Sequence, residues 1–276
     1  MVEIHPARLE DLAQAQQLWA RVFGDDAAFQ RDFYALTGLD GPLVLLEDGQ
    51  VQSMLALPEV TLTFPDGRSV KGGYVYALAT RPEARGRGYA AQLLDYACQT
   101  LKDCLADCIL TVPAQPSLFS FFARCGFLPA LYHRRLTANP IPTPATPLSP
   151  QDYAAVREDL LSGIVHVTHS PGQLEVQRRL CPHPGSGLYR LELAHGPGYA
   201  AVECWPAGPV VKELLCDPRD EDQGAGAAAA LCGGPTQVRL PPLPQAGQPF
   251  GAIRWLYGRP ERWPQPPWGY LGLAFD

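Results

Sequence analysis

The sequence lacks a long apolar run, and its N-terminus lacks the pattern of a secretion signal. No stretch approaches the roughly 20 apolar residues that a membrane-spanning helix requires. Met1-Val2-Glu3-Ile4-His5 has no basic segment followed by an apolar one, which a signal peptide would show. We therefore expect a soluble, cytoplasmic protein that has no membrane partner.

Charged residues are scarce, and basic residues are in the minority. They make up 18% of the 276 residues, and the formal net charge is −6. Nucleic acids and anionic membranes attract basic surfaces, so this balance argues against a nucleic-acid partner. Hydrophobic residues reach 46%, which excludes wholesale disorder. The length fits two domains of ordinary size better than one.

Cys-x-x-Cys pairs are also missing, although the chain contains eight cysteines. Several cysteines lie within apolar periodic segments, so we expect small buried hydrophobic residues rather than disulfides. His166 and His169 have a spacing that would suit two metal ligands on one helix face. No third ligand lies near them in the sequence, so we expect no metal site.

Proline concentrates in one segment near the middle of the chain. Residues 139–150 contain five prolines in twelve positions. Proline removes backbone donors and favours an extended spacer. We predict a first domain at 1–138, a linker at 139–150 and a second domain at 151–276.

The first half mixes helical and strand periodicity. A strand at residues 2–4 precedes two helices that end near Gly24 and Gly38. Asp-Gly pairs between the following apolar segments indicate an antiparallel meander. The further predicted elements are strands at 43–46, 51–64 and 70–80, a helix at 88–101, a strand at 108–112, a short helix at 117–124 and closing strands at 127–136.

The second half repeats part of this plan. Its predicted elements are a helix at 173–180, strands at 188–193, 199–204 and 210–215, an alanine-rich helix at 223–232, and strands at 236–240, 250–256 and 270–275. Strands, one helix and further strands mirror the centre of the first half, so we predict an internal duplication. The expected fold class is mixed α+β, with a central, mostly antiparallel sheet flanked by helices.

The most informative segment is a junction at residues 76–90, where a strand enters a glycine-bearing turn that opens a helix. The first amides of a helix have no internal acceptor, and the helix dipole adds partial positive charge. Gly86 and Gly88 let the backbone approach a ligand closely. Arg85 and Arg87 add fixed positive charge. The junction therefore predicts a cradle for a pyrophosphate.

The junction has two other interpretations. A dinucleotide-binding fingerprint is disfavoured, because the Gly-x-Gly-x-x-Gly spacing is absent and the preceding strands form a meander instead of a βαβ unit. A purely structural strand, turn and helix with a solvated arginine pair remains an alternative.

Arg85, Gly88 and Ala90 match the Arg/Gln-x-x-Gly-x-Gly/Ala signature for acetyl-CoA, so the junction resembles that of the GNAT acetyltransferase superfamily. Residues 124–127, Arg-Cys-Gly-Phe, are similar to the family's aromatic-x-x-x-Gly-Phe ending. The resemblance covers about residues 1–137. It implies a GNAT fold, an N-acetyltransferase that uses acetyl-CoA without a metal, and a degenerate GNAT-like second domain in tandem.

The resemblance also implies which residues contact the cofactor. The amides from Gly86 to Ala90 would hold the pyrophosphate, and the backbone at 78–80 would pair with the pantetheine arm like an added strand. In this family that strand splays from the next one, here 109–113, and the thioester sits in the gap. The expected cofactor residues are Leu78, Ala79, Thr80, Arg85, Gly86, Arg87, Gly88, Tyr89, Ala90, Ser117 and Phe122.

The proton donor of the family is missing. Many members use a tyrosine four residues before the glycine of Gly-Phe to protonate the departing thiolate, and Phe122 stands there. Phenylalanine cannot donate a proton, so we consider Tyr76, Tyr132 and His133 as replacements. Glu59, placed in the middle of the third predicted strand, is a candidate base. For each of them an ordinary strand position is the competing interpretation.

The end of the chain offers another base. Residues 269–276 are mostly apolar up to the last residue, although chain ends usually fray, which indicates a buried end. The N-myristoyltransferases and the enhanced-intracellular-survival acetyltransferases use a C-terminal carboxylate as general base. By that similarity the α-carboxylate of Asp276 would deprotonate the acceptor amine. The alternative is a strand that only completes the second domain's sheet.

The second half lacks the signature. Residues 217–223 carry four carboxylates, which would repel a pyrophosphate. We expect this half to bind no CoA and instead to shape the acceptor pocket or stabilise the first domain. Its late aromatic residues would line such a pocket or pack under proline-rich loops. They are Trp255, Tyr257, Trp263 and Trp268.

The predicted activity is direct attack of a primary amine on acetyl-CoA. The acceptor is a small molecule or peptide, and an acidic protein favours a cationic one. The protein is expected to be a monomer or a homodimer. Two alternatives remain: a non-catalytic CoA- or acyl-CoA-binding protein, motivated by Phe122, and an aminoacyl transferase that uses aminoacyl-tRNA, for which the sequence offers no basic channel.

Overall fold

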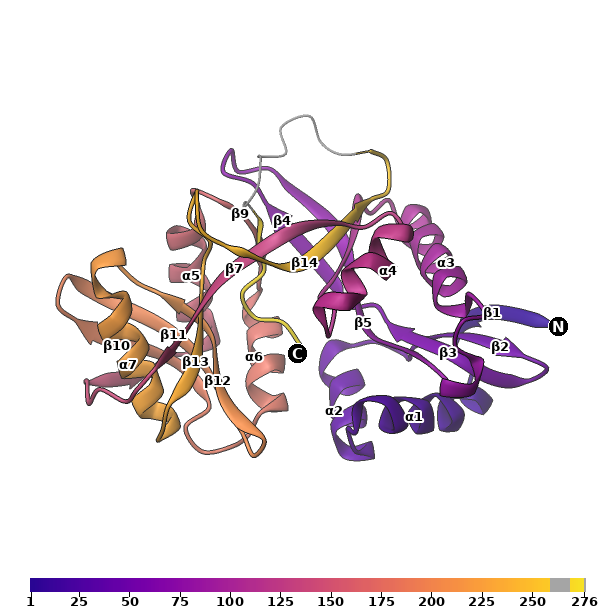
Figure 1. Cartoon of the computed structure of the whole chain (residues 1–276), viewed down its shortest axis with the longest axis horizontal. Coiled ribbons are helices and arrows are strands. Elements are labelled where there is room, and N and C mark those ends of the chain that lie inside the picture. Colours follow the sequence, from indigo (N-terminus) through magenta and orange to yellow (C-terminus); the bar gives the residue numbers. More distant parts are fainter. Residues whose placement is uncertain (259–268, 276) are drawn as a thin grey trace. The chain divides into compact units, whose positions relative to one another are not determined.

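The computed structural model describes residues 1–258 and 269–275 and divides into two compact units (Figure 1). Unit 1 comprises Met1–Thr61, Val70–Pro129 and the described residues from Gly251 to 258; unit 2 comprises Leu62–Ser69, Ala130–Phe250 and residues 269–275. The chain thus passes between the units several times. The predicted division into 1–138, 139–150 and 151–276 does not coincide with these units.

Unit 1 holds most of the elements predicted for the first half. They are β1 (Val2–Pro6), α1 (Leu9–Phe23), α2 (Ala27–Thr37), β2 (Leu43–Glu47), β3 (Gln50–Ala56), β5 (Ser69–Thr80), η1 (Pro82–Ala84), α3 (Tyr89–Asp103), β6 (Cys108–Thr111), η2 (Pro116–Leu118) and α4 (Phe119–Arg124). Strand β4 (Glu59–Thr63) begins in unit 1, as does β7 (Leu128–Ala138).

Local signals explain the two leading helices. α1 ends at Gly24, whose φ of 83° is the left-handed conformation that glycine adopts without strain. Asp26 caps α2 by accepting a hydrogen bond from the Phe29 amide at 2.8 Å. α2 ends at Gly38, with φ 70°. Both helix ends were predicted from the glycines.

The sheet of unit 1 runs β1, β2, β3, β5 with antiparallel neighbours, as the Asp-Gly turns predicted. β6 then pairs with β5 in parallel, and the C-terminal part of β14 (Gln248–Trp255) pairs with β6 antiparallel. Residues 250–256 were predicted to close the second half. Residues 251–256 contribute to unit 1 instead, where Ala252–Trp255 pair with β6, whereas Phe250 belongs to unit 2.

One predicted strand is two. Residues 51–64 form β3 and β4, which are separated at Leu57 and Pro58. Proline has no N–H to donate to a strand neighbour, so the ladder breaks there. Glu59 consequently begins β4 and is exposed, whereas the sequence placed it in the middle of a strand.

Unit 2 repeats the order seen in the centre of unit 1. β10, β11 and β12 form an antiparallel meander, α7 follows, and β13 pairs with β12 in parallel. The elements are β8 (Ala145–Pro147), α5 (Pro150–Leu161), β9 (Val165–Thr168), α6 (Pro171–Leu180), β10 (Gly187–Leu193), β11 (Gly196–Trp205), β12 (Gly208–Leu215), η3 (Pro218–Asp220), α7 (Glu221–Cys232), β13 (Thr236–Leu240) and β15 (Gly269–Tyr270).

The proline-rich segment is part of unit 2. Residues 145–147 form β8, which pairs with β10, and Ser149 caps α5 by accepting from the Asp152 amide at 3.1 Å. The Ile141 side chain lies where a Cβ of Gly226 would be. The predicted spacer is therefore packed structure, because proline suits both an edge strand and the first turn of a helix.

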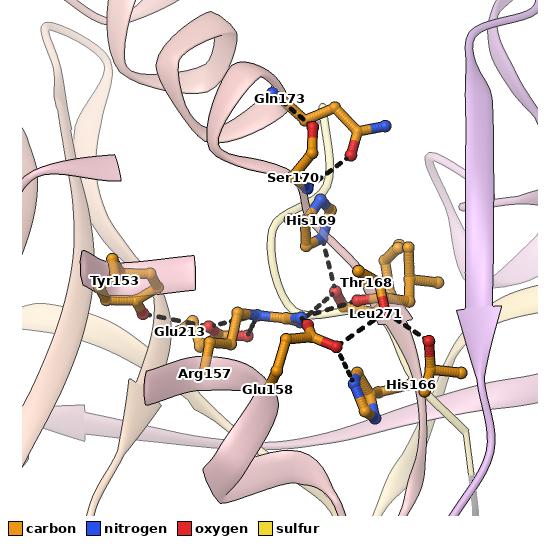
Figure 2. A network of polar contacts seen from close by, with 12 residues as sticks. Tyr153, Arg157, Glu158, His166, Thr168, His169, Ser170, Gln173, Glu213 and Leu271 are labelled. Carbon is orange, nitrogen blue, oxygen red and sulfur yellow. Dashed lines mark hydrogen bonds and ion pairs between the residues drawn. The ribbon is translucent and has the colours of Figure 1, made fainter. Parts of the chain in front are cut away.

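A buried ion pair stands at the centre of unit 2 (Figure 2). The side chains of Arg157 and Glu213 are fully buried, and Arg157 Nε donates to Glu213 Oε2 at 2.9 Å. Tyr153 Oη donates to the same carboxylate at 3.1 Å. The guanidinium also donates to the carbonyl oxygens of Val167 at 2.7 Å and Leu271 at 3.2 Å. Helix α5 was not predicted, since its inner face carries this arginine.

The C-terminal segment is anchored by polar side chains. The predicted strand 270–275 shortens to β15, yet residues 271–274 are buried. Lys212 Nζ and Gln177 Nε2 donate to the Ala274 carbonyl at 3.1 and 3.2 Å. Gly272 has φ 72°, and a Cβ there would overlap the Glu213 carboxylate. Side-chain donors thus replace strand pairing along the tail.

Replacing Arg157 by Met should destabilise the protein by about 3 to 5 kcal/mol, because Glu213 would be left as an unpaired buried charge. Replacing both Arg157 and Glu213 by Met should recover most of that loss. Urea denaturation followed by circular dichroism measures the difference. A single variant as stable as the double variant would contradict a role for the ion pair.

His169 makes the stability depend on pH. Its Nε2 contacts the Leu271 carbonyl at 3.1 Å and therefore donates, since a carbonyl only accepts. Desolvation, and then the nearby Arg157 charge, lower the pKa of His169 from 6.5 to about 3. Below pH 6.5 the His169 imidazole of the unfolded chain therefore binds a proton, whereas that of the folded chain stays neutral until the pH approaches 3.

Stability should fall by up to about 1.4 kcal/mol per pH unit as the pH drops from 6.5 towards 3. His169→Gln should remove this part of the slope, because glutamine offers an N–H donor that does not titrate. Free energies of unfolding measured at several pH values for both proteins test this. Parallel curves for the two proteins would show that His169 does not titrate as stated.

Candidate functional site

Strand β5 loses its neighbour halfway along one edge. On the other edge it pairs with β3 up to Ser53 opposite Thr80. Towards β6 the parallel pairing covers only Gly72–Val75. Beyond Val75 the described residues supply no strand partner on that edge. The main-chain N–H and C=O groups that residues 76–80 direct towards that edge therefore lack a strand partner there.

A bulge marks the place where the strands part. Ala77 has φ 49°, a left-handed conformation that is costly for alanine, and the β3–β5 register shifts opposite it. A bulge bends a strand and increases its twist. Just before it, Thr111 Oγ1 donates to the Val75 carbonyl at 3.2 Å and fixes the last paired position. β5 thus turns away from β6 as it approaches the glycine loop.

The loop after β5 presents bare backbone. Gly86 and Gly88 have φ of 79° and 81°, and Gly88 is the N-cap of α3. Apart from the residues next to it in the chain, no described residue has an atom within 4 Å of where a Gly86 Cβ would be. Only the end of the Gln92 side chain approaches the corresponding position at Gly88, at 3.9 Å. The first amides of α3, at Tyr89 and Ala90, have no helix acceptor. The predicted cradle therefore has the backbone form that an anion requires.

The two loop arginines differ in their surroundings. Arg87 forms a bidentate ion pair with Glu47 at 2.7 and 2.5 Å, and its guanidinium lies 4.9 Å from the Tyr89 ring centroid. Hydrogen bonds from Arg87 and then Tyr89 lower the pKa of Glu47. Arg85 is exposed, its Nε lies 3.4 Å from the Thr80 carbonyl, and it makes no ion pair within the described chain. Arg85 is thus the available cation.

Sequence analysis missed two residues that support the loop. Ser53 is fully buried; its Oγ donates to the Ala79 carbonyl at 2.8 Å and lies 3.0 Å from Thr80 Oγ1. Glu47 holds Arg87, as described above. Neither has a recognisable spacing in the sequence, since both act across strands from more than 25 positions away.

The candidate proton donors and bases are dispersed. Tyr76 is half-buried, with its ring centroid 5.6 Å from Trp19 and 5.0 Å from Phe33. Phe122 is buried and packs on Phe127 at 5.4 Å. Tyr76, Phe122 and the exposed Glu59 belong to unit 1. The Phe122 ring is part of the apolar core of unit 1 and offers no proton.

The remaining predicted residues lie elsewhere. Ser117 is exposed in η2, where its carbonyl accepts from Ser120 Oγ at 2.9 Å. Tyr132 and His133 belong to unit 2, where His133 stacks on Phe250 at 4.1 Å. Asp276, Trp263 and Trp268 fall outside the described residues. Trp255 ends β14, and Tyr257 is exposed with its hydroxyl donating to the Lys102 carbonyl at 3.0 Å.

The Gly-Phe ending has a structural reason. Gly126 follows α4 with φ 82°, and a Cβ there would lie 3.3 Å from Arg254 Cδ. Arg254 NH1 donates to the Cys125 carbonyl at 3.0 Å and to Asp95 at 2.8 Å. Glycine is needed for the backbone turn, and the turn directs Phe127 into the core beside Phe122.

The corresponding place in unit 2 is filled. β12 pairs with β13 only at Val210 and Val211, and the β11–β12 register shifts beside Lys212. This repeats the bulge and the lost pairing of β5. Lys212 and Glu213 next to the bulge contact the tail, as described above. The loop of unit 2 that corresponds to the glycine loop of unit 1 carries acidic residues instead. Arg219 donates to Asp217 at 2.8 Å, and this hydrogen bond lowers the pKa of the Asp217 carboxyl.

The cysteines and histidines serve local roles. All eight cysteines are free in the structure; Cys98, Cys108 and Cys181 are buried, as expected, whereas Cys104 is exposed. His166 lies in β9 and not on a helix; its Nε2 is 3.1 Å from Glu158 Oε2. The described residues contain no group of three metal-ligating side chains, and none of their helices is long and apolar enough to cross a membrane.

The chain is similar to known proteins in both sequence and fold. Residues 3–130 match the family model described as an acetyltransferase (GNAT) domain. A probable N-acyltransferase from Enterococcus faecalis superposes with a TM-score of 0.69 at 14% identity, covering 93% of this chain and 73% of that one. No curated protein matches the sequence.

Two further solved structures cover as much of the chain. A GCN5-related N-acetyltransferase from Anabaena variabilis superposes with a TM-score of 0.64 at 15% identity, covering 93% of this chain and 73% of that one. Eis1 from Mycobacterium abscessus gives 0.62 at 15%, covering 93% and 74%. At such low sequence identities, the superpositions show a shared fold alone. Residues 3–130 are thus similar to the acetyltransferase (GNAT) domain, and the likeness of the whole chain to these solved structures is one of fold.

Proposed function

We propose that this protein transfers an acetyl group from acetyl-CoA to a primary amine by direct attack, with acetyl-CoA bound in unit 1. The proposal rests on one observation: the open edge of β5 leads directly into the glycine loop. Acetyl-CoA has a doubly charged pyrophosphate joined to an extended arm that carries amide groups. A strand edge that continues into an anion cradle is complementary to both parts.

The expected cofactor contacts follow from that order. Main-chain groups of Leu78, Ala79 and Thr80 would pair with the pantetheine amides. The amides from Gly86 to Ala90 would receive the pyrophosphate, with Arg85 adding charge from an exposed position. Arg87 would act through Glu47, by holding the loop against the end of β2. Ser117 and Phe122 remain predicted contacts.

Transfer needs a base for the amine and an acid for the leaving thiolate. The amine nitrogen attacks the thioester carbonyl, the carbon–sulfur bond breaks, and the sulfur gains a proton. Phe122 cannot supply that proton, so we assign it to Tyr76, which immediately follows the last β5–β6 pair. Glu59 and the α-carboxylate of Asp276 are the proposed bases. A cationic acceptor suits the net charge of −6.

We further propose that unit 2 is a degenerate GNAT-like domain in tandem with the first, and that it binds no CoA. Its bulged strand contacts the tail, and carboxylates occupy the position of the cradle. A second candidate function is CoA or acyl-CoA binding without catalysis, which Phe122 favours. An aminoacyl transferase on the same scaffold remains an alternative, but no observation supports it.

Calorimetry with CoA should give one binding site per chain. Arg85→Gln should weaken binding about tenfold or more, because charge-assisted hydrogen bonds to phosphate are lost. Gly88→Val should weaken it further, since a branched residue at φ 81° is strained and its side chain would stand at the cradle. Arg68→Gln is the matched control, because Arg68 is an exposed arginine of unit 2. The absence of saturation at millimolar CoA, or two sites per chain, would overturn the assignment.

Thiol release from acetyl-CoA in the presence of an amine panel tests catalysis. Tyr76→Phe should lower kcat by about a hundredfold, the usual minimum for a general acid, while CoA affinity stays unchanged. Phe122→Tyr in that background should restore part of the rate, by returning the hydroxyl to the family's usual position. A wild-type protein that binds CoA but releases no thiol with any amine would favour the binding function. An unchanged kcat in Tyr76→Phe would exclude Tyr76 as the acid.

A further inference from the structure

Hydrogen bonds at the end of β5 show which of its main-chain groups face β3. The Arg81 amide donates to the Gln52 carbonyl at 2.9 Å. Two residues earlier, the Ala79 carbonyl accepts from Ser53 Oγ at 2.8 Å. Gln52 and Ser53 belong to β3. Ala79 and Arg81 therefore both direct main-chain groups towards that strand.

The alternate residues of β5 face the other way. In an extended strand the N–H and C=O groups of successive residues point to opposite edges, so those of Leu78 and Thr80 point to the edge that β6 leaves open. Arg85 Nε, which lies 3.4 Å from the Thr80 carbonyl, belongs to the glycine loop and not to β3, in agreement with this direction. A ligand that extends the sheet can therefore pair with Leu78 and Thr80, while Ala79 stays bonded to β3.

Ser53 fixes this alternation just after the bulge. The register between β3 and β5 shifts between Met54 and Ala56, beside the left-handed Ala77. A bulge places an extra residue in one strand, and a slip of one residue reverses the direction of every following group. Ser53 is fully buried, and its hydroxyl bonds the second residue after Ala77. The same hydroxyl lies 3.0 Å from Thr80 Oγ1. It thus holds both residues that follow Leu78 in a single register.

We propose that Ser53 is a positioning residue for the extended arm of the cofactor, an inference that rests on the proposed function. Its hydroxyl holds the Ala79 carbonyl against β3. This bond keeps the N–H and C=O groups of Leu78 and Thr80 at the open edge, where the amides of the pantetheine arm pair with them. Ser53 is buried behind that edge and acts through Ala79, without touching the cofactor.

The arm and the pyrophosphate have separate supports. The hydroxyl of Ser53 contacts Ala79 and Thr80, at the end of the strand. Glu47 instead holds Arg87, within the glycine loop, by a bidentate ion pair. Removing the Ser53 hydroxyl should therefore weaken ligands that contain the arm and spare a ligand that contains only the nucleotide.

The test compares two ligands by calorimetry on the full chain. One is CoA; the other is the nucleotide half of CoA, an adenosine diphosphate with a further phosphate on the ribose, which lacks the arm. Ser53→Ala removes only the hydroxyl and should weaken CoA binding about fivefold, the effect of one neutral hydrogen bond, while binding of the nucleotide half stays unchanged. Arg85→Gln should weaken both ligands. A general loss of stability would not separate the two ligands in this way.

Thr37→Val is the control, because Thr37 also donates to a main-chain carbonyl, that of Phe33 at 2.7 Å, but within α2. It should leave CoA binding unchanged. Ser53→Cys keeps a weak donor, so it should lose less affinity for CoA than Ser53→Ala, and it carries the test if the alanine variant does not fold.

Three results would overturn the role of Ser53 in a wild-type protein that binds CoA. They are unchanged CoA affinity in the Ser53 variants, an equal loss for the nucleotide half, and an equal loss in Thr37→Val. A wild-type protein that binds no CoA would instead overturn the proposed function, and the role of Ser53 with it.

Discussion

A β-strand that loses a neighbour must satisfy its main-chain donors and acceptors in another way. In unit 1 this constraint falls on β5, where pairing with β6 stops at Val75 and a bulge at Ala77 bends the strand away. The unsatisfied edge and the glycine loop are consecutive in the chain. Everything proposed for the cofactor depends on this break, because a continuous sheet would leave no strand edge for a ligand to extend.

In unit 2 the protein's own side chains occupy the place of the same break. Its β12 also parts from β13 beside a register shift, yet the next residues are Lys212 and Glu213. Their charges are buried and are compensated by Arg157, Glu203 and carbonyls of the tail. Removing a partner of a buried charge is strongly destabilising, since it leaves an uncompensated ion in the core. This arrangement holds the tail in place by polar bonds that a strand pair would otherwise have supplied.

Local signals carried most of the fold prediction, and they failed where tertiary contacts decide. Gly24, Gly38 and the Asp-Gly turns located helices and hairpins because they act on their own backbone. Helix α5 was missed, since its inner face buries Arg157 among its apolar residues. Residues 251–256 were assigned to the second half, although they belong to unit 1, because strand pairing is not local. The strand, glycine turn and helix of the junction at residues 76–90 were predicted correctly, whereas their role as a pyrophosphate cradle stays a prediction. Ser53 and Glu47 were not identified, since their partners are distant in sequence.

The electrostatics of the glycine loop also distinguish Arg85 from Arg87. In a protein of net charge −6, two arginines beside a cradle look equivalent in the sequence. Glu47 removes that equivalence, because a bidentate pair largely cancels the charge of Arg87 and fixes its side chain. A cation that is already paired offers a diphosphate less than an unpaired one. Under the proposed function, Arg85 would therefore carry the attraction, while Arg87 would fix the position of the amides that Gly88 exposes.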